Sequence, residues 1–151
     1  MSQTKARAGL LAVATMMIGT LAWAAAPAGR YTVNEQAGTV LDNKTGLTWQ
    51  RAVPDRTYNW ADAQTYCQEL NLGGFSSGWR LPTRLELETL VDVRASSPVI
   101  DVTAFPATPA KHFWTSSLLA GGTLSAWYLH FDDGSTGDYG TFYTLRVRCV
   151  R

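Results

Sequence analysis

The two cysteines of the chain, Cys67 and Cys149, are the residues whose chemistry the sequence predicts most directly. In an oxidising compartment an even number of cysteines favours a disulfide. A Cys67–Cys149 bridge would close a loop of about 80 residues, which the chain-entropy model values at roughly 4 kcal/mol. A pair of free buried thiols is the alternative.

The other residue types that perform catalysis or bind metals do not form a motif. The two histidines, His112 and His130, lack the helical spacing of a zinc site, and no third ligand is evident. No nucleophile-elbow pattern surrounds the serines. The Asp132–Ser135 segment lacks the spacing of a calcium loop and is typical of a turn. We therefore expect no catalytic residue, metal or cofactor, with a triad assembled in space from distant residues as the alternative.

A modest basic and aromatic surface is the sharpest ligand hypothesis. Alternation over the last residues puts Arg146 and Arg148 on the outer side of a strand. Basic side chains there would suit a sulfated or carboxylated glycan, and tyrosines of the same face would stack on sugar rings. A solvated sheet face without a ligand is the alternative. The candidate ligand-binding residues are Lys111, His112, Tyr128, His130, Arg146 and Arg148.

Two helices are expected between the sheet-forming parts of the chain. The first should run over residues 59–70, where an apolar stripe includes Cys67 and two glycines then stop the helix. The second should begin at Thr83, because Glu86 three residues later completes a capping box, and should fade near Arg94. Cys67 is thereby predicted to face the core.

Strands are expected before and after the helices. The turn Asn43–Gly46 should join two strands into a hairpin. The segment Ala95–Lys111 contains three prolines and is predicted to be a long irregular loop and a candidate ligand surface. The predicted strands cover residues 31–33, 39–42, 47–50, 113–117, 126–131 and 143–151.

The order of these elements predicts an α+β fold, since strands come first, two helices follow, and antiparallel strands close the domain. Leu145, Val147 and Cys149 share the inner side of the last predicted strand. Cys149 on that strand could therefore meet Cys67 on the inner face of the first helix. The two-residue period of the strand and the 3.6-residue period of the helix therefore both place the cysteines where a disulfide can form.

The first residues are typical of a secretory leader. Lys5 and Arg7 precede an uncharged apolar run, and Ala22-Trp23-Ala24 is a pattern that a signal peptidase cuts. We expect a signal peptide over residues 1–24, a short linker over 25–30 and a single domain over 31–151. The protein would then be exported to the periplasm, cell surface or medium, with no stable membrane span after cleavage. A retained membrane anchor is the alternative, although the apolar run is short for a span.

The charge and aromatic content limit the classes of partner. The formal net charge is +1. A nearly neutral chain lacks the strong positive field on which nucleic-acid and membrane-surface binding depend, so neither partner is expected. Six tryptophans, six tyrosines and five phenylalanines supply large apolar areas for a core.

Five short segments carry a resemblance to a known family, and they are Leu47–Gln50, Trp60–Ala63, Gly73–Phe75, Trp79–Thr83 and Val147–Val150. In type and order they resemble the Lcl C-terminal domain family, named for the end domain of a bacterial collagen-like adhesin. The resemblance implies a C-type-lectin-like fold, with two helices packed on a small twisted antiparallel sheet beside a long irregular loop. It also implies that Cys67 in the first helix is bonded to Cys149 in the last strand.

The resemblance also bears on function. The domain of the adhesin is associated with sulfated polysaccharides. The sugar-binding triplets of calcium-dependent lectins are missing here, as are the extra cysteines of formylglycine-generating oxidases, so neither activity is expected. We expect an exported non-catalytic binding module that recognises a polysaccharide or a protein partner at the cell envelope. A divergent envelope enzyme on the same fold and a structural accessory subunit of a larger assembly are the alternatives.

Overall fold

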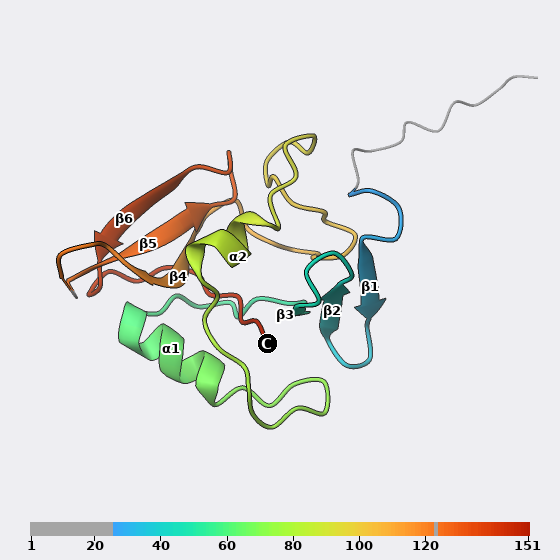
Figure 1. Cartoon of the computed structure of the whole chain (residues 1–151), viewed down its shortest axis with the longest axis horizontal. Helices are drawn as coiled ribbons and strands as arrows, with labels where there is room; N and C mark the ends of the chain where they lie inside the picture. The colour runs from blue at the N-terminus through green and yellow to red at the C-terminus, as the bar shows by residue number, and fades with distance from the viewer. Residues whose placement is uncertain (1–25, 123) are drawn as a thin grey trace, which may run out of the picture.

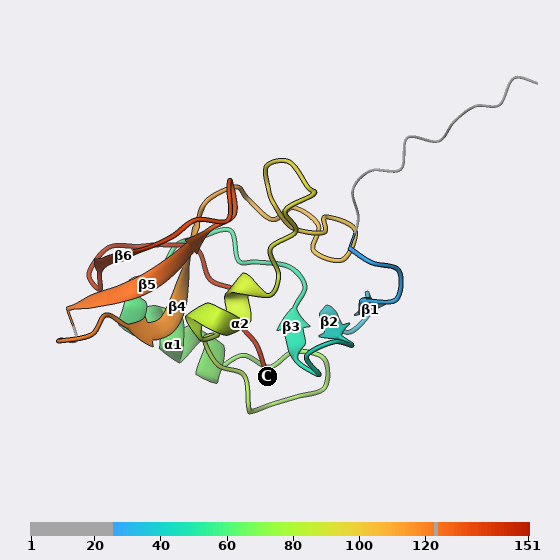
Figure 2. The same ribbon diagram turned by 45° about the horizontal axis from the view of Figure 1, so that its top comes forward.

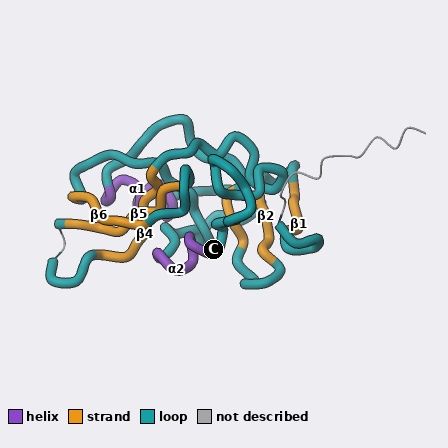
Figure 3. The backbone as a smooth tube through the Cα atoms, turned by 90° about the horizontal axis from the view of Figure 1, so that it is seen from above, coloured by secondary structure: helices purple, strands orange, loops and turns teal. Residues whose placement is uncertain are grey.

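Two three-stranded antiparallel sheets, with two short helices between them in the sequence, make up the computed structural model (Figure 1). The structure describes residues 26–122 and 124–151, so the predicted signal peptide 1–24 lies outside it. The elements are β1 Tyr31–Asn34, β2 Thr39–Asp42, β3 Thr48–Gln50, α1 Trp60–Gln68, α2 Arg84–Glu88, β4 His112–Leu118, β5 Ser125–His130 and β6 Thr136–Gly140. Figure 3 shows the strands gathered into two groups at opposite ends of the molecule, with long connections between them.

The first sheet has the order β1-β2-β3 and contains the predicted hairpin. The turn between β2 and β3 closes where the amide of Gly46 donates to the carbonyl oxygen of Asp42 at 2.8 Å. Gly46 has a φ of +73°, a conformation that glycine adopts without steric cost. The Asp42 side chain accepts from the amide of Lys44 and from the guanidinium of Arg30, each at 3.0 Å. The hairpin prediction is confirmed.

Helix α1 begins within one residue of its predicted start, and α2 begins at the predicted capping box. The amide of Asp62 donates to the side chain of Asn59 at the start of α1, and Cys67 is fully buried on the inner face of that helix. Thr83 and Glu86 form the capping box of α2. This second helix ends at Glu88, well before the predicted end near Arg94, and the amide of Asp92 already donates to the carbonyl oxygen of Val99 instead of to a helical carbonyl.

The second sheet has the order β4-β5-β6. Strands β4 and β5 match the predicted segments closely. Strand β6, Thr-Gly-Asp-Tyr-Gly, was not predicted, because glycine and aspartate are poor strand formers. Its pairing with β5 over five residue pairs, from Thr136 to Gly140, holds it in place.

The last residues, 145–151, connect the two sheets, and we call them the C-terminal segment. They do not form the regular strand predicted over 143–151. Val150 makes antiparallel bridges to Trp49 of β3 on one side and to Arg80 on the other. Nearer the second sheet, Arg146 exchanges backbone hydrogen bonds with β4, where Trp114 donates to it and His112 accepts from it. Figure 2 shows the segment running from the second sheet into the middle of the molecule.

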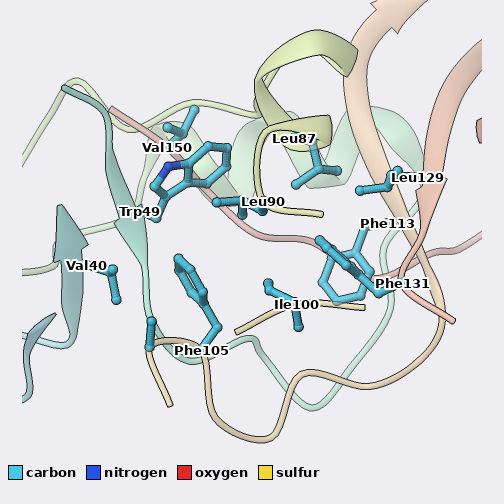
Figure 4. Close-up of a cluster of buried hydrophobic side chains, with 11 residues drawn as sticks. Val40, Trp49, Leu87, Leu90, Ile100, Phe105, Phe113, Leu129, Phe131 and Val150 are labelled. Carbon is cyan, nitrogen blue, oxygen red and sulfur yellow. The ribbon is translucent and has the colours of Figure 1, made fainter. Parts of the chain in front are cut away.

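Two clusters of buried side chains form the core. One cluster lies between the sheets and includes Trp49, Leu87, Phe105, Phe131 and Val150 (Figure 4). The other surrounds the disulfide, which joins α1 to the C-terminal segment. Cys67 and Cys149 are bonded with their Cα atoms 5.5 Å apart and 82 residues apart in sequence, so the predicted bridge is confirmed.

The predicted α+β, C-type-lectin-like fold is wrong. The structure is mostly β, with two separate three-stranded sheets in place of one small sheet, and its helices contribute only nine and five residues. The reason lies in the C-terminal segment. The prediction makes this segment one strand of one sheet, but it pairs in turn with four separate parts of the chain, namely β4, Tyr58, Arg80 and β3. Within residues 26–122 and 124–151, no helix is long and apolar enough to cross a membrane.

Removal of the disulfide is expected to destabilise the fold strongly, because the bond closes a loop of 82 residues around the segment that connects the sheets. We expect the double variant Cys67→Ala/Cys149→Ala to lose about 4 kcal/mol of unfolding free energy. Chemical denaturation of the oxidised protein, the reduced protein and the double variant checks this. Equal denaturation midpoints for the oxidised and reduced proteins would contradict it.

Candidate functional site

Six rings lie in a row along one side of the second sheet, and we call them the aromatic row. Successive ring centroids are 4.0, 4.6, 4.9, 5.5 and 4.4 Å apart, so each ring contacts the next. In spatial order the members are His130, His112, Tyr128, Tyr139, Tyr143 and Phe142.

The register of the strands produces this row. His112 of β4 lies opposite His130 of β5, and Tyr128 shares the face of His130 because side chains alternate along a strand. Tyr139 of β6 lies opposite Ala126, which is on that same face. The predicted face of Tyr128 and His130 is therefore formed, and the row extends it across β6.

Two glycines of β6 let rings of the row lie against the backbone. A Cβ atom on Gly137 would stand 2.6 Å from the hydroxyl of Tyr128, which lies across from it in β5. A Cβ atom on Gly140 would stand 2.6 Å from the ring of Phe142. Such distances are too short for any side chain, so only glycine admits these two rings.

The row is open to solvent at one end and half-buried at the other. Tyr139, Tyr143 and Phe142 are 38%, 52% and 74% exposed. His112, Tyr128 and His130 are intermediate in burial, and Tyr128 also packs against the core cluster around the disulfide. A contiguous exposed aromatic surface of this kind is typical of a binding site.

Few charges border the row. Asp133 approaches His130, with 3.7 Å between its Oδ1 and the histidine Nδ1. Lys111, a predicted site residue, is exposed and directly precedes His112. The pKa of His112 lies below its ordinary value of 6.5, because burial lowers it most and the nearby His130 lowers it further. The Asp133 carboxylate raises the pKa of His112 in turn. Burial raises the pKa of Tyr128.

The two predicted arginines do not join the row. Arg148 is fully buried, and its guanidinium donates to the carbonyl oxygens of Gln50 and Arg51 and to the hydroxyl of Thr108, at 2.7 to 2.9 Å. Burial lowers its pKa to about 9, which leaves it charged at neutral pH. Arg146 donates to the carbonyl oxygen of Pro54 at 3.1 Å, away from the sheet face.

The prediction that Arg148 faces outward is thus wrong. Alternation along a strand separates a buried side from an exposed side only when the strand is covered on one side. The C-terminal segment lies between the two sheets, so both of its sides are covered and Arg148 is buried like Val147 and Cys149. Its cation also lies over the ring of Phe105, 4.6 Å from the ring centroid.

The predicted loop Ala95–Lys111 is irregular, as expected, but much of it belongs to the core. Val99, Ile100, Ala104 and Phe105 are buried, and Ile100, Ala104 and Phe105 lie in the cluster between the sheets. The loop therefore offers less free surface than its length suggested.

A cleft beside α1 was not predicted. It has a volume of about 470 Å³, and Arg56, Tyr58, Asp62, Tyr66 and Glu69 are among the residues that line it. The Arg56 guanidinium lies over the Tyr58 ring at 4.4 Å, and the hydroxyl of Tyr66 accepts from Gln50 at 2.7 Å. The spacing of residues 62, 66 and 69 along one helical face was the signal in the sequence that could have indicated this surface.

Metal ligands do not gather at either site. Over the described ranges 26–122 and 124–151, no group of three or more His, Cys, Asp or Glu residues could hold a metal ion. The Asp132–Ser135 segment forms a turn in which the Asp133 carboxylate accepts the amide of Ser135 at 2.9 Å.

Comparison with known proteins identifies one domain. The family model described as the Lcl C-terminal domain matches residues 38–151, which include every strand from β2 onward and both helices. No curated protein matches the chain.

Arg148 and Arg146 offer a matched pair for a stability test. Arg148→Met would leave two buried carbonyl oxygens and a buried hydroxyl without their donor, so we expect a loss of about 3 kcal/mol of unfolding free energy. Arg146→Met removes a partly exposed side chain and should cost less than about 1 kcal/mol. Guanidinium denaturation measures both, and equal losses would refute the structural role of Arg148.

Proposed function

The chain belongs to the Lcl C-terminal domain family, and from this premise we propose that it is an exported, non-catalytic binding module whose aromatic row holds a polysaccharide. The single observation that carries the proposal is the row itself, with six rings in continuous contact on a sheet face that is open to solvent at one end.

The chemistry of the row suits a sugar chain. The faces of a pyranose ring carry C–H groups that pack on aromatic rings, while its hydroxyls need hydrogen-bond partners. Tyrosine and histidine supply both an apolar ring and a polar atom at the edge. The row is also several rings long, which favours an extended ligand over a single small ring.

The charges around the row favour a sugar over a nucleic acid. Single-stranded nucleic acids also stack on aromatic rings, but their sites add a strongly positive groove. Here Lys111 and Asp133 act on His112 in opposite directions, and the net charge of the chain is only +1. The tyrosines of the row therefore lack the cationic surroundings that a phosphate backbone requires.

Export is part of the proposal. Residues 1–24 have the pattern of a signal peptide. The Cys67–Cys149 disulfide supports an oxidising destination, because such bonds persist in the periplasm and outside the cell. The compartment matters for function, since an exported module meets the polysaccharides of the envelope.

Docking to another protein is the second candidate, because an exposed aromatic surface also suits a protein interface. Phe142 and Leu124, which are 74% and 79% exposed, favour it. The two candidates differ in what they bind. A sugar module holds a pure polysaccharide without any partner, whereas a docking subunit does not.

Truncation of two exposed rings tests the proposal. We expect Tyr139→Ala/Tyr143→Ala to weaken binding to soluble neutral glucans or mannans at least about tenfold, since each stacked ring contributes about 0.5–1.5 kcal/mol beyond its burial. Titration calorimetry on the oxidised protein measures the affinity. Circular dichroism checks that the variant is folded.

Arg56→Ala is the matched control, because Arg56 is an exposed residue that lines the α1 cleft and not the row. Its affinity should equal that of the unaltered protein. Weaker binding in this control together with full binding in the tyrosine variant would move the site to the cleft. Failure of the unaltered protein to bind any polysaccharide would refute the proposed function.

A further inference from the structure

The half-buried end of the aromatic row is a stacked pair of histidines. The rings of His112 and His130 lie 4.0 Å apart at their centroids and only 8° from parallel. Tyr128 and Tyr139 meet the His112 ring edge-on, at 4.6 and 5.5 Å. Any ligand lying along the row therefore reaches two imidazoles that can gain charge.

The charged groups around the pair come from three elements. Lys111 precedes β4, Asp133 lies in the turn after β5, and Asp138 lies in β6. The guanidinium of Arg146, whose backbone pairs with His112, is directed toward Pro54 and Asp55 instead. Lys111 and Asp133 act on the pKa of His112 in opposite directions, whereas Asp138 lies opposite Trp127 and therefore on the other face of the sheet.

Acid changes this balance. Burial and the proximity of His130 keep the pKa of His112 below 6.5, so His112 is neutral at pH 7.5. As the pH falls, His112 gains a positive charge, which the Asp133 carboxylate beside His130 favours. A second proton is disfavoured, because two imidazolium rings 4.0 Å apart repel each other.

We propose that the His112–His130 pair is an acid-strengthened subsite for the carboxylate of an acidic sugar at one end of the aromatic row. This inference rests on the proposed polysaccharide function. A carboxylate attached to a pyranose extends from the edge of the ring. A sugar stacked on Tyr128 or Tyr139 can therefore bring that group to the neighbouring imidazoles. The carboxylate keeps its charge down to about pH 4, so between pH 7.5 and 5.5 only the protein titrates.

Calorimetry with two probes of equal length tests the subsite, namely an oligogalacturonate and a neutral gluco-oligosaccharide. From pH 7.5 to 5.5 we expect the affinity for oligogalacturonate to rise about fivefold, as one charge-assisted hydrogen bond forms, and the affinity for the neutral probe to stay level. The variant His112→Gln/His130→Gln should lose the rise. Lys111→Gln should weaken oligogalacturonate binding equally at both pH values and keep the rise.

Several outcomes would overturn the subsite. One is the same rise in the double variant, and another is an equal rise for the neutral probe. An affinity for oligogalacturonate that does not change between pH 7.5 and 5.5, together with tight binding of the neutral probe, would refute the subsite and leave the proposed function standing. Binding of neither probe, nor of any other polysaccharide, would remove both.

An NMR titration of the histidine ring protons tests the charge step without any ligand. Because His130 lowers the pKa of His112, we expect the His112 midpoint to lie below 6.5 and to move to higher pH in His130→Gln, whereas Asp133→Asn should move it to lower pH. A His112 midpoint that is unchanged in His130→Gln would refute the coupling on which the subsite depends.

Discussion

The backbone pairing of the C-terminal segment is the constraint on which the rest of the structure depends. Val150 lies between Trp49 and Arg80, and four residues earlier Arg146 pairs with β4. Two sheets that share no ladder are thereby held in one frame, and the Cys67–Cys149 bond fixes α1 to the same segment. Because the segment is covered on both sides, its polar backbone groups find partners in the protein instead of in water, as buried amides and carbonyls must.

This frame explains why the aromatic residues divide into two sets. Trp49, Trp79 and Trp114 are almost fully buried between or beside the sheets, where their large areas stabilise the fold. The tyrosines and histidines of the row lie instead on the side of the second sheet that the core covers only in part. The sheet keeps their spacing fixed, so a ligand would meet rings that are already in position, and little ordering would be required on binding.

Local signals in the sequence predicted local structure well. The Asn43–Gly46 turn, the capping box of the second helix and the strand predicted over residues 126–131 all depend on contacts between near neighbours, and all were found, the strand one residue earlier. The arrangement of the sheets was not predictable in this way, since the C-terminal segment pairs with residues far away in sequence. Of the site, His112, Tyr128 and His130 were among the residues of the predicted basic and aromatic surface. Tyr139 and Phe142 were missed because β6 has two glycines, and Arg148 was misplaced because alternation assumes one open side.

The central position of the C-terminal segment also has a consequence for how the protein is made. Thr48 exchanges both of its backbone hydrogen bonds with Arg151, so the first sheet cannot complete its pairing until Arg151 has emerged from the ribosome. Contacts of such long sequence separation form late and slowly. During synthesis the emerging chain therefore lacks the pairing that joins its two sheets, and the Cys67–Cys149 bond can fix the finished fold only after the C-terminal segment has docked.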